Sequence, residues 1–560
     1  MTCNGSSRAG QVRVLDETFA SCIDRTGSRL FYAIAAAENL LVYGSDVSNA
    51  FGEAAPPKQG FYIRPDQAFK EWWTEHKGYP PIPDGYVIPV LAAMQGHPES
   101  PRLWEKHIDK ILRSIGLTPT THEPCLYSGT FLGERVLLMR QVNDFAVAAP
   151  TSRLADHLFD LIDEQLSIPL KRQGLVSLYN GLDVLQTRQY IKISCQTFIE
   201  RACDVHLTQG WMKDYHISDR PLPLPTSHTF LRDFLGSCGS SDPDAYRKLE
   251  KSAGLSYRQG VGQLSYAMTC CRPDLSYPAK CHFDGLRHAL KYLYQTRMDG
   301  LYFWRSSPRD ELEDISPPRI MSANVGDLLP DGRPQHEALT IFGFSDADWA
   351  ACPKTRRSLT GVCVKMAGAT IAYKTRMQRT IATSSTESEL MAAYDLGKIM
   401  LYIRSVLWDL DVPQEAATHI YEDNDACTII ANAQKVSDRT RHMDIKYKVL
   451  GEWIDRDLLV MSRVNTTVNE ADQFTKSLSR ILFHRHLDYI MGHVPPQYAP
   501  GYNRVLGLFE GTPSPVISSF TVREDRTLYD VGDVSSFCFS PDISCQHTSH
   551  PWWNLVAGSA

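Results

Sequence analysis

The spacing of apolar residues predicts short strands alternating with helices along most of the chain. Apolar runs at residues 40–43 and 136–139 each end in a polar cluster that contains an aspartate. Residues 103–112 and 154–162 have the apolar spacing of helices. After residue 334, three strand-like runs precede a long helix with one apolar face, formed by Leu396, Met400, Ile403, Leu407 and Leu410. Strands followed by a helix in this order predict α/β character for the C-terminal part.

Two proline-rich stretches and a polar tail divide the chain. Residues 214–244 and 306–334 combine proline, glycine and serine with little apolar periodicity, which predicts linkers or long surface connections. Beyond His493 the sequence is again rich in these residues, and we expect a poorly ordered tail. The expected segments are residues 1–213, 214–335, 336–492 and 493–560.

Composition excludes several classes of protein. The 560 residues are 43% hydrophobic, so a wholly disordered chain is excluded and several domains are expected. The net charge of −6 excludes a uniformly basic nucleic-acid coat protein but permits a basic groove on an acidic body. Polar residues interrupt every long apolar stretch and the N-terminus has no apolar signal core. We therefore expect neither a membrane span nor secretion.

The 14 cysteines contain no Cys-x-x-Cys pair, which favours reduced thiols inside the cell. One cluster near the C-terminus has zinc-ligand residue types without a standard zinc-finger spacing, namely Cys538, Cys545, His547 and His550. A zinc-dependent interaction protein that uses this tail is the hypothesis that lies outside the enzyme classes.

Four acidic residues in the C-terminal half lie where buried apolar residues would be expected, namely Asp346, Glu389, Asp423 and Asp472. Strand alternation places Asp346 on the face of Phe344, and Glu389 lies two helical turns before the first residue of the long apolar face. A buried carboxylate is costly unless it is paired or binds a metal ion. Taken singly, Asp423 could be a turn residue and Asp472 could favour the helix dipole. Together, the four predict a site for divalent cations.

The sequence around these carboxylates is that of a known family. SDADWA (345–350), SSTESELMA (384–392), YEDNDA (421–426), RTRHMDIKY (439–447) and ADQFTK (471–476) resemble the ribonuclease H domain of copia-type LTR retrotransposons. The resemblance implies that the four carboxylates are metal ligands. It also implies hydrolysis of the RNA strand of an RNA–DNA hybrid with two Mg²⁺ or Mn²⁺ ions.

A basic stretch is consistent with binding to nucleic acid. Between Trp349 and Thr386 the sequence has no acidic residue, whereas its cationic residues are Lys354, Arg356, Arg357, Lys365, Lys374, Arg376 and Arg379. A solvated strand face is the alternative to a phosphate-binding surface. We predict that Lys354, Arg356, Arg357 and Arg376 contact the nucleic-acid backbone.

The first half resembles the reverse transcriptase of the same family. GSDVSNAF (44–51) resembles the motif in which a strand ends in a metal-binding aspartate, here Asp46. The resemblance implies that the aromatic residue of this motif, Phe51, lies under the sugar of the incoming nucleotide and excludes a 2′-hydroxyl.

Further motifs extend the resemblance from residue 15 to about residue 487. MQGHPESPRLW (94–104) resembles the segment beneath template and nucleotide, which makes Gln95 and Gly96 candidates for substrate contact. The remaining matches are HEPCLY (122–127), YNGLDV (179–184) and GQLSYAMTCCRPDLSY (262–277).

One position departs from the pattern of the family. Where the family has two aspartates at a hairpin tip, this chain has Asn143 followed by Asp144. Asn143 holds the position of the carboxylate that would bind both ions together with Asp46, and an amide carries no negative charge. Neighbouring strand residues point to opposite faces, although less strictly at a hairpin tip. We expect Asp46 and Asp144 to be the metal ligands and the polymerase activity to be impaired.

The resemblance implies an α/β and α+β multidomain protein. Residues 1–213 would form a fingers/palm reverse transcriptase core and residues 214–335 a thumb- or connection-like region. Residues 336–492 would form a ribonuclease H-like α/β domain. A complete element also encodes capsid, protease and integrase regions, for which this chain has no room. We therefore expect a fragment of a polyprotein.

The implied function is RNA-directed DNA synthesis with ribonuclease H activity, and two Mg²⁺ or Mn²⁺ ions per intact site. The expected partners are an RNA template, a DNA primer, the RNA–DNA hybrid and deoxynucleoside triphosphates, with no membrane. Self-association is left open. We expect an intracellular protein, cytoplasmic and also nuclear at integration. The alternative is a non-catalytic nucleic-acid-binding relic of a transposable element.

Overall fold

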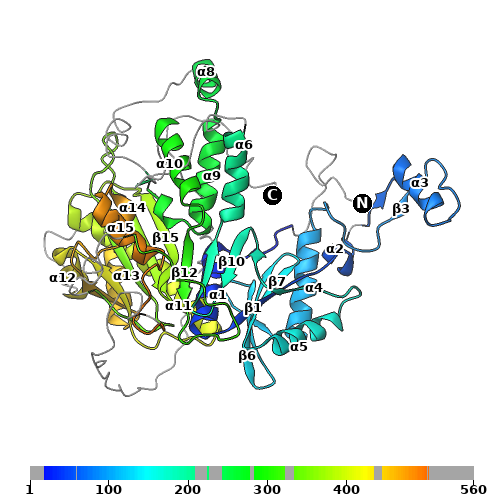
Figure 1. Cartoon of the computed structure of the whole chain (residues 1–560), viewed down its shortest axis with the longest axis horizontal. Coiled ribbons are helices and arrows are strands. Elements are labelled where there is room, and N and C mark those ends of the chain that lie inside the picture. Colours follow the sequence, from blue (N-terminus) through cyan, green and yellow to red (C-terminus); the bar gives the residue numbers. More distant parts are fainter. Residues whose placement is uncertain are drawn as a thin grey trace. The chain divides into compact units, whose positions relative to one another are not determined.

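The computed structural model describes residues 18–58, 60–208, 224–225, 243–277, 283–321, 333–433, 444–500 and 502. All of these residues belong to one structural unit, Met1–Val516, whose helices and strands are labelled in Figure 1. The cysteine and histidine cluster of the tail, and most of the predicted linker at 214–244, lie outside the described residues. Within the described ranges, no helix has the length and apolarity needed to cross a membrane.

The N-terminal half is built on a six-stranded antiparallel sheet, the N-terminal sheet, with the strand order β4-β5-β6-β7-β1-β8. Its strands are β1 (Leu41–Asp46), β4 (Thr118–Pro119), β5 (Leu126–Phe131), β6 (Glu134–Gln141), β7 (Asp144–Ala149) and β8 (Lys171–Leu175). β1 and β6 confirm the strands predicted at residues 40–43 and 136–139. Leu41 and Tyr43 enter one apolar cluster and Val42 enters another, because successive strand residues point to opposite faces. Both faces of β1 are therefore buried.

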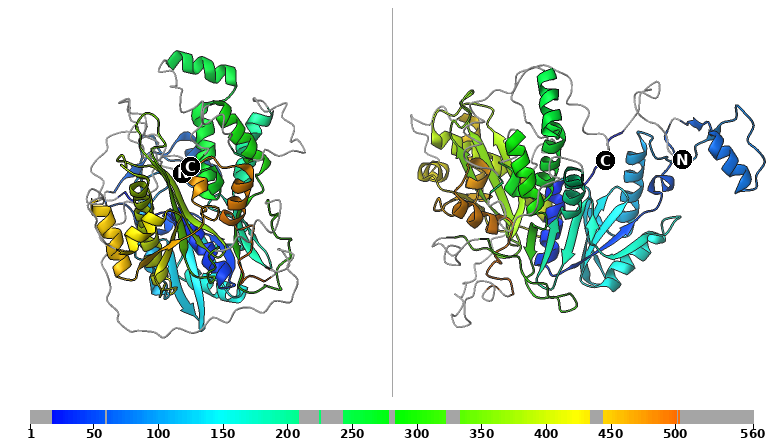
Figure 2. Two further views of the ribbon diagram at one scale, coloured as in Figure 1. Left: turned by 90° about the vertical axis from the view of Figure 1, so that its left-hand side faces the viewer. Right: turned by 45° about the horizontal axis from the view of Figure 1, so that its top comes forward.

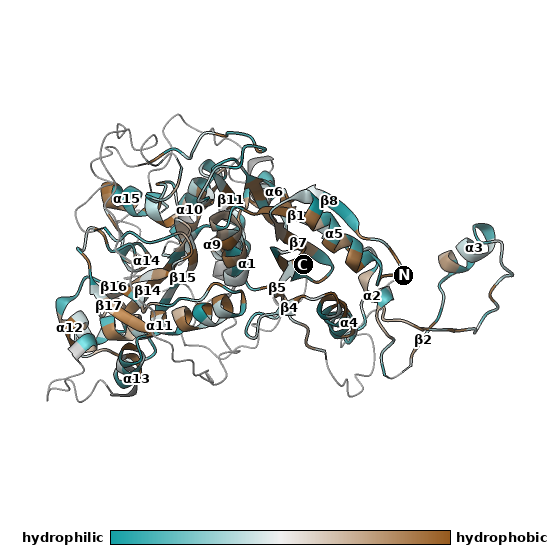
Figure 3. Cartoon of the chain, turned by 90° about the horizontal axis from the view of Figure 1, so that it is seen from below, coloured by the Kyte–Doolittle hydropathy of each residue, from teal (hydrophilic) through white to brown (hydrophobic). Residues whose placement is uncertain are grey.

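Two helices cover one face of the N-terminal sheet. α4 (Ser100–Ser114) and α5 (Ser152–Asp163) contribute Trp104, Ile108 and Leu158 to the cluster that contains Leu41. Both helices have a hydrophobic and a hydrophilic side in Figure 3, as expected for helices that lie between a sheet and solvent. They confirm the helices predicted at residues 103–112 and 154–162.

A connecting segment with its own short helices and strands lies between β1 and α4. It contains α2 (Ala50–Glu53), α3 (Gln67–Glu75) and a two-stranded sheet of β2 (Tyr62–Ile63) and β3 (Ile88–Pro89). No residue of α3 is buried.

The middle sheet has the antiparallel order β12-β11-β10-β9. Its strands are β9 (Leu178–Tyr179), β10 (Leu182–Gln186), β11 (Tyr190–Ser194) and β12 (Gly300–Trp304). β12 comes from the predicted thumb-like region and pairs with β11 of the preceding segment. Gly300 permits this pairing, because a Cβ atom there would lie 2.2 Å from the carbonyl oxygen of Ile193.

Helices occupy the chain between β11 and β12. They are α6 (Gln196–Thr208), α8 (Pro243–Ala253), α9 (Tyr257–Cys270), the 3₁₀ helix η1 (Pro273–Leu275) and α10 (Phe283–Gln295). α9 and α10 lie side by side in both views of Figure 2. Gly260 allows their close approach, because a Cβ atom there would lie 2.9 Å from Leu286 Cδ2.

The C-terminal sheet has five strands in the order β15-β14-β13-β16-β17. They are β13 (Phe342–Asp348), β14 (Leu359–Met366), β15 (Ala369–Met377), β16 (Thr418–Glu422) and β17 (Leu459–Arg463). The first three form an antiparallel meander, whereas β13, β16 and β17 are parallel neighbours. The predicted α/β and α+β class is thus confirmed, with the mixed parallel and antiparallel sheet in the C-terminal part.

Five helices accompany the C-terminal sheet, namely α11 (Ser385–Asp409), α12 (Asp425–Ala433), α13 (Asp444–Asp455), α14 (Asp472–Thr475) and α15 (Arg480–Ile490). α11 is the long helix that the sequence predicts, and Leu396, Met400 and Ile403 are fully buried on its apolar face. Its N-terminus is capped by Ser384, whose side chain accepts a hydrogen bond from the Glu387 amide. The described chain continues past the predicted boundary at residue 492, and Val494 and Ala499 are buried.

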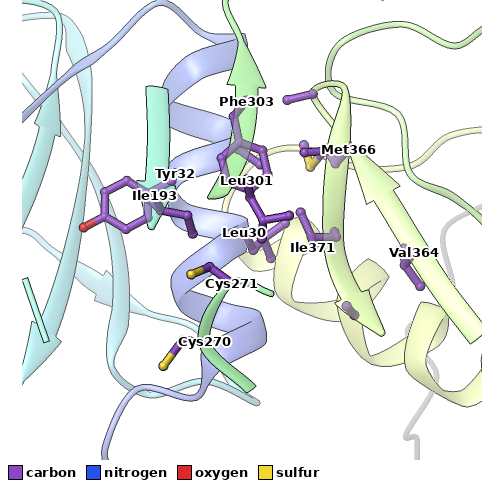
Figure 4. Packing of buried hydrophobic residues seen from close by; sticks show 14 of the residues in the cluster. Leu30, Tyr32, Ile193, Cys270, Cys271, Leu301, Phe303, Val364, Met366 and Ile371 are labelled. Atoms are coloured by element: carbon purple, nitrogen blue, oxygen red, sulfur yellow. The ribbon is translucent and has the colours of Figure 1, made fainter. Parts of the chain in front are cut away.

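α1 (Arg25–Ala37) is packed against strands of all three sheets. Every residue of α1 except Arg25 is buried, including the polar Thr26, Ser28 and Arg29 of its first turns. Figure 4 shows Leu30 and Tyr32 of α1 near residues of the middle and C-terminal sheets, among them Ile193, Leu301 and Ile371. One apolar core therefore connects the two halves of the described chain.

A buried ion-pair network joins the end of α15 to the middle sheet. His493 Nε2 lies 2.9 Å from Asp299 Oδ1, and Nδ1 lies 3.0 Å from Asp488 Oδ1. Burial acts to lower the pKa of His493, but the two carboxylates raise it to about 10. Burial acts to raise the pKa of Asp299, but the charge of His493 holds it down at about 2. The imidazolium is therefore charged at neutral pH.

We expect His493→Gln to lower the free energy of unfolding by roughly 3–5 kcal/mol near pH 6, because the buried Asp488 and the partly buried Asp299 lose their cation. The folded-state pKa of about 10 exceeds the ordinary value of 6.5. The stabilisation is therefore fully present below about pH 6.5 and is lost as the pH rises through 10. Urea unfolding should show that the difference in free energy of unfolding between the natural protein and the His493→Gln variant is smaller at pH 10 than at pH 6. An equal difference at both pH values would contradict a charged His493.

Two candidate active sites

Asp346 and Asp423 lie at one edge of the C-terminal sheet because β13 and β16 are parallel neighbours. Phe344 pairs with Tyr421 across the two strands, and each carboxylate follows two residues later. Asn469 fixes Asp423, since its Nδ2 donates to Asp423 Oδ1 at 3.1 Å and to the Ser345 carbonyl oxygen at 2.9 Å. The ends of two parallel strands thus supply two of the four predicted carboxylates.

A glycine brings the third carboxylate, Asp472, to this edge. Asp346 pairs with Gly361 of β14. A Cβ atom at Gly361 would lie 2.6 Å from Thr475 Cγ2 and 2.8 Å from Phe474 Cβ, so only glycine lets α14 lie against β14 here. Thr475 Oγ1 donates a hydrogen bond to Asp346 Oδ2, which ties α14 to β13.

Glu389 completes the group from the second turn of α11. The residue is 7% exposed, and its Oε2 atom is buried without a hydrogen-bond partner. Burial raises the pKa of Glu389 well above its ordinary value, and the charges of Glu422, Asp346 and Asp423 raise it further. An ionised Glu389 would therefore need a cation at this position.

A fifth carboxylate, Glu422, was not predicted from the sequence. It ends β16, is fully buried, and accepts a hydrogen bond of 2.7 Å from Ser345 Oγ. Its other oxygen accepts from the backbone amides of Asp423 and Asn424. Period-two alternation would have placed Glu422 on the same buried face as Ile420, which was a usable signal. These hydrogen bonds indicate that it positions the Asp423 turn.

One ammonium group lies among these carboxylates. Lys476 Nζ is 3.0 Å from Asp346 Oδ1 and 2.8 Å from Asp472 Oδ1. Burial and the charge of Asp346 raise the pKa of Asp472 to about 8, although Lys476 acts in the opposite direction. Burial acts to lower the pKa of Lys476, but the two carboxylates raise it above its ordinary value.

The residues fit a site for Mg²⁺ or Mn²⁺. Carboxylate oxygens are the ligands that these ions prefer, and the unpartnered Glu389 Oε2 and the trapped ammonium of Lys476 both indicate a deficit of positive charge. Among the described residues, no three acidic, histidine or cysteine side chains already stand in coordinating geometry. Ion binding would thus require side-chain adjustment. Residues 439–443 of the motif RTRHMDIKY lie outside the described chain.

The basic stretch near this site divides into exposed and engaged residues. Lys354 and Arg356 are exposed and Arg357 is half-buried. Arg376 forms an ion pair of 2.5 Å with Asp395. Lys365 does not belong to a phosphate-binding surface, since it is buried.

The burial of Lys365 has a specific cause. Its Nζ lies 2.9 Å from Glu470 Oε2, and it also donates to the Tyr489 carbonyl oxygen. A buried cation of this kind is satisfied inside the domain and cannot track a nucleic-acid backbone.

The second candidate site lies at the end of β1 in the N-terminal sheet. Asp46 pairs with Asp144 at the start of β7, and the Asn143 side chain adjoins both. Asn143 Nδ2 donates to Asp46 Oδ1 at 2.5 Å. Burial raises the pKa of Asp144, and the neighbouring Asp46 charge raises it further. Asp46, Asn143 and Asp144 are therefore neighbours at the end of β1.

A two-residue turn explains why Asn143 also reaches Asp46, although Asp144 is already the direct partner of Asp46 in the register of β1 and β7. Val142 and Asn143 connect β6 to β7, and Val142 has a φ of 54°, which is unfavourable for a β-branched residue. Two hydrogen bonds hold this turn: Trp104 Nε1 donates to the Val142 carbonyl oxygen at 2.7 Å, and the Val47 amide donates to the Asn143 carbonyl oxygen at 2.9 Å. Because Asn143 lies in the turn, strand alternation does not direct its side chain away from Asp46.

The predicted nucleotide-binding residues lie in the connecting segment between β1 and α4. Phe51 is on α2 and packs, half-buried, against the cluster of the N-terminal sheet. Gln95 and Gly96 are exposed in a turn, and Gly96 has a φ of 90°, which favours glycine. The Ala93 amide donates to the Ala54 carbonyl oxygen at 3.0 Å, so the two segments are neighbours.

Comparisons with known proteins define the class. Residues 4–216 match the family described as reverse transcriptase (RNA-dependent DNA polymerase). The chain is 25% identical over 482 residues to the retrovirus-related Pol polyprotein from transposon TNT 1-94 of Nicotiana tabacum, covering 84% of this chain and 32% of that protein. It is 21% identical to the Pol polyprotein from transposon RE2 of Arabidopsis thaliana, covering 83% of this chain and 29% of that protein.

Residues 4–216 thus carry the match to the reverse transcriptase family, and most of the chain is similar to Pol polyproteins of retrotransposons. The chain spans about a third of the length of these relatives. A solved structure of LC11-RNase H1 in complex with an RNA/DNA hybrid is 15% identical, covering 24% of this chain and 94% of that chain, with a TM-score of 0.19. A TM-score of this size adds no argument, and the fold class rests on the strand order above.

We expect the exposed Arg356 and the half-buried Arg357 to contribute to hybrid binding by pairing with phosphates. Replacing Arg356 and Arg357 with Gln should reduce the slope of log affinity against log salt by about 0.9 for each phosphate that is no longer neutralised. Arg376→Gln should change it less, because Asp395 already neutralises Arg376.

Binding to a labelled RNA–DNA hybrid, titrated at several salt concentrations without divalent ions, measures these slopes. Arg456→Gln is the control, since Arg456 follows α13 and pairs with Glu452 of that helix. An unchanged slope in the double variant would identify this surface as an ordinary solvated face.

Proposed function

We propose that the C-terminal site hydrolyses the RNA strand of RNA–DNA hybrids and that the N-terminal site is an impaired RNA-directed DNA polymerase. The observation that supports the proposal is that the charges of Asp346 and Asp423 act on both Glu389 and Asp472, while Glu389 Oε2 is buried without a hydrogen-bond partner. A structural salt-bridge network would have satisfied this oxygen. The protein would meet these substrates inside the cell, in the cytoplasm and, at integration, in the nucleus.

In this proposal each carboxylate has a positional role. Asp346, held by Thr475, and Asp472 would face one another across the ions, while Glu389 and Asp423 would complete the ligand set. Two bound divalent ions would supply an activated water and stabilise the leaving oxygen of the scissile phosphate. Asn469 and Glu422 keep Asp423 and its turn in place, and the exposed arginines would hold the substrate backbone.

The N-terminal site supports a weaker proposal. Asp46 and Asp144 would bind the ions for a deoxynucleoside triphosphate, with Phe51 under its sugar and Gln95 and Gly96 near the template. The Asn143 amide lowers the negative charge of this site and uses Asp46 Oδ1 as a hydrogen-bond acceptor. That hydrogen bond favours the second candidate for this half, a nucleic-acid-binding relic that no longer synthesises DNA.

We expect Glu389→Gln to reduce cleavage of the RNA strand by at least about a hundredfold, which corresponds to roughly 2.7 kcal/mol of transition-state stabilisation. The amide keeps the shape of the side chain but removes a charge that the ions require. Hybrid affinity should be nearly unchanged, because the exposed arginines are intact.

Cleavage of a 5′-labelled RNA in a hybrid, in Mg²⁺ and in EDTA, checks this. The exposed Glu452→Gln on α13 is the matched control and should cleave like the natural protein. Natural-level cleavage by the Glu389 variant would reject the assignment of this residue.

We expect Asn143→Asp to raise DNA synthesis at least about tenfold over the natural protein, since each ~1.4 kcal/mol of transition-state stabilisation is tenfold in rate. The new carboxylate would supply the missing charge and free Asp46 Oδ1 from the amide. Without divalent ions the same variant should have a lower free energy of unfolding than the natural protein, because the carboxylates at positions 46, 143 and 144 would repel one another.

Primer extension on an RNA template measures the effect. The double variant Asp46→Asn/Asn143→Asp has the same total charge as the natural protein, but its carboxylate is at position 143 and the amide at position 46. DNA synthesis by this double variant should stay at background. Robust extension by the natural protein would show that Asn143 is not at a ligand position. Extension that stays at background in Asn143→Asp would contradict this single-site explanation.

A further inference from the structure

The side chain of Lys476 forms ion pairs with two carboxylates of the C-terminal site, those of Asp346 and Asp472. Its ammonium lies 3.0 Å from Asp346 Oδ1 and 2.8 Å from Asp472 Oδ1. Its backbone amide donates to the Asp472 carbonyl oxygen at 3.0 Å, so the base of the side chain is fixed at the end of α14.

Both oxygens of Asp346 have a hydrogen-bond partner while Lys476 is in this position. Oδ1 faces the ammonium, and Oδ2 accepts the hydrogen bond from Thr475 Oγ1. A metal ion binds a carboxylate oxygen at about 2.0–2.1 Å, which is closer than the ammonium lies. An ion that takes the position of either partner therefore displaces that partner.

The burial of the two partners decides which one leaves. Thr475 is fully buried and packs over Gly361. The Lys476 side chain is 37% exposed and flexible, so its ammonium can move into solvent without disturbing the core.

We propose that Lys476 is a built-in placeholder for the divalent cation. In the metal-free protein its ammonium neutralises Asp346 and Asp472, and it must swing out before an ion can bind them. Lys476 is therefore a positioning residue that sets the metal affinity of the site. This inference rests on the proposed function of the carboxylate cluster as a metal site.

The placeholder couples the ions to the substrate. After leaving the carboxylates, the ammonium is still tethered at the end of α14, beside the place where a scissile phosphate would lie. A phosphate would stabilise the outward position, so a bound hybrid should tighten ion binding, and bound ions should tighten hybrid binding by the same factor. A purely structural ion pair would give no such reciprocity.

The test is a calorimetric titration of the full chain with Mn²⁺, without substrate. Lys476→Met should tighten the apparent affinity about tenfold, as expected if the binding-competent state is populated about one-tenth of the time in the natural protein. The metal-free variant should unfold at a lower temperature in EDTA, because the carboxylates lose their cation. Lys476→Arg should keep the weak binding of the natural protein, since a guanidinium can bridge the same oxygens.

Lys448→Met is the matched control, since Lys448 is exposed on α13. It should change neither the Mn²⁺ affinity nor the unfolding temperature in EDTA. Lys476→Gln provides a second neutral variant if the methionine variant does not fold. Equal Mn²⁺ affinity in the natural protein and the neutral variants would overturn the placeholder, even if the metal-free variants are less stable.

The failure of this inference differs from the failure of the proposed function. Metal-dependent cleavage together with unchanged Mn²⁺ affinity in the neutral variants rejects only the placeholder. Tightened Mn²⁺ binding without any cleavage of a hybrid rejects the proposed activity and leaves the placeholder standing. The absence of Mn²⁺ binding in every variant rejects both.

Discussion

The described structure depends on the burial of α1, which contacts strands of the N-terminal, middle and C-terminal sheets. The residues from Leu30 to Ala37 are apolar and buried, so this part of the helix requires apolar partners on every side. Arg29 is the buried charge of the helix, and its guanidinium donates to the carbonyl oxygens of Thr269, Cys270 and Ile371. A buried cation is tolerated only where its donors are satisfied in this way. The same helix therefore joins the two halves that carry the candidate sites.

In both candidate sites, neighbouring carboxylates that are partly removed from water repel one another. The two sites reduce this repulsion in different ways. The C-terminal site keeps all four carboxylates and inserts the ammonium of Lys476, which a divalent ion can displace. The N-terminal site has an amide in place of one carboxylate, and Asn143 donates to Asp46. The first solution is reversible by ligand binding, whereas the second is fixed in the covalent structure. This difference is why the proposed activities of the two halves diverge.

Much of the fold and most of the candidate residues could be predicted from the sequence. The period of apolar positions predicted β13 to β15 and α11, because each of these elements buries apolar residues in a regular pattern. Motif resemblance identified the four carboxylates, which the parallel pairing of β13 and β16 helps to assemble. The sequence could not show that Lys365 pairs with Glu470, which is 105 residues away, because ion pairs depend on three-dimensional register. It likewise could not show that Lys476 reaches Asp346, that Asp144 is the register partner of Asp46, or that the Val142 turn brings Asn143 to the same aspartate.

The central claim is that the C-terminal carboxylates form a site for two divalent ions. Anomalous scattering from crystals of the full chain, grown with an RNA–DNA hybrid and Mn²⁺, tests it most directly. We expect two manganese peaks about 3.5–4 Å apart among Asp346, Glu389, Asp423 and Asp472, with Lys476 turned away from Asp346. The absence of peaks there at saturating Mn²⁺, or peaks bound only by other residues, would contradict the claim.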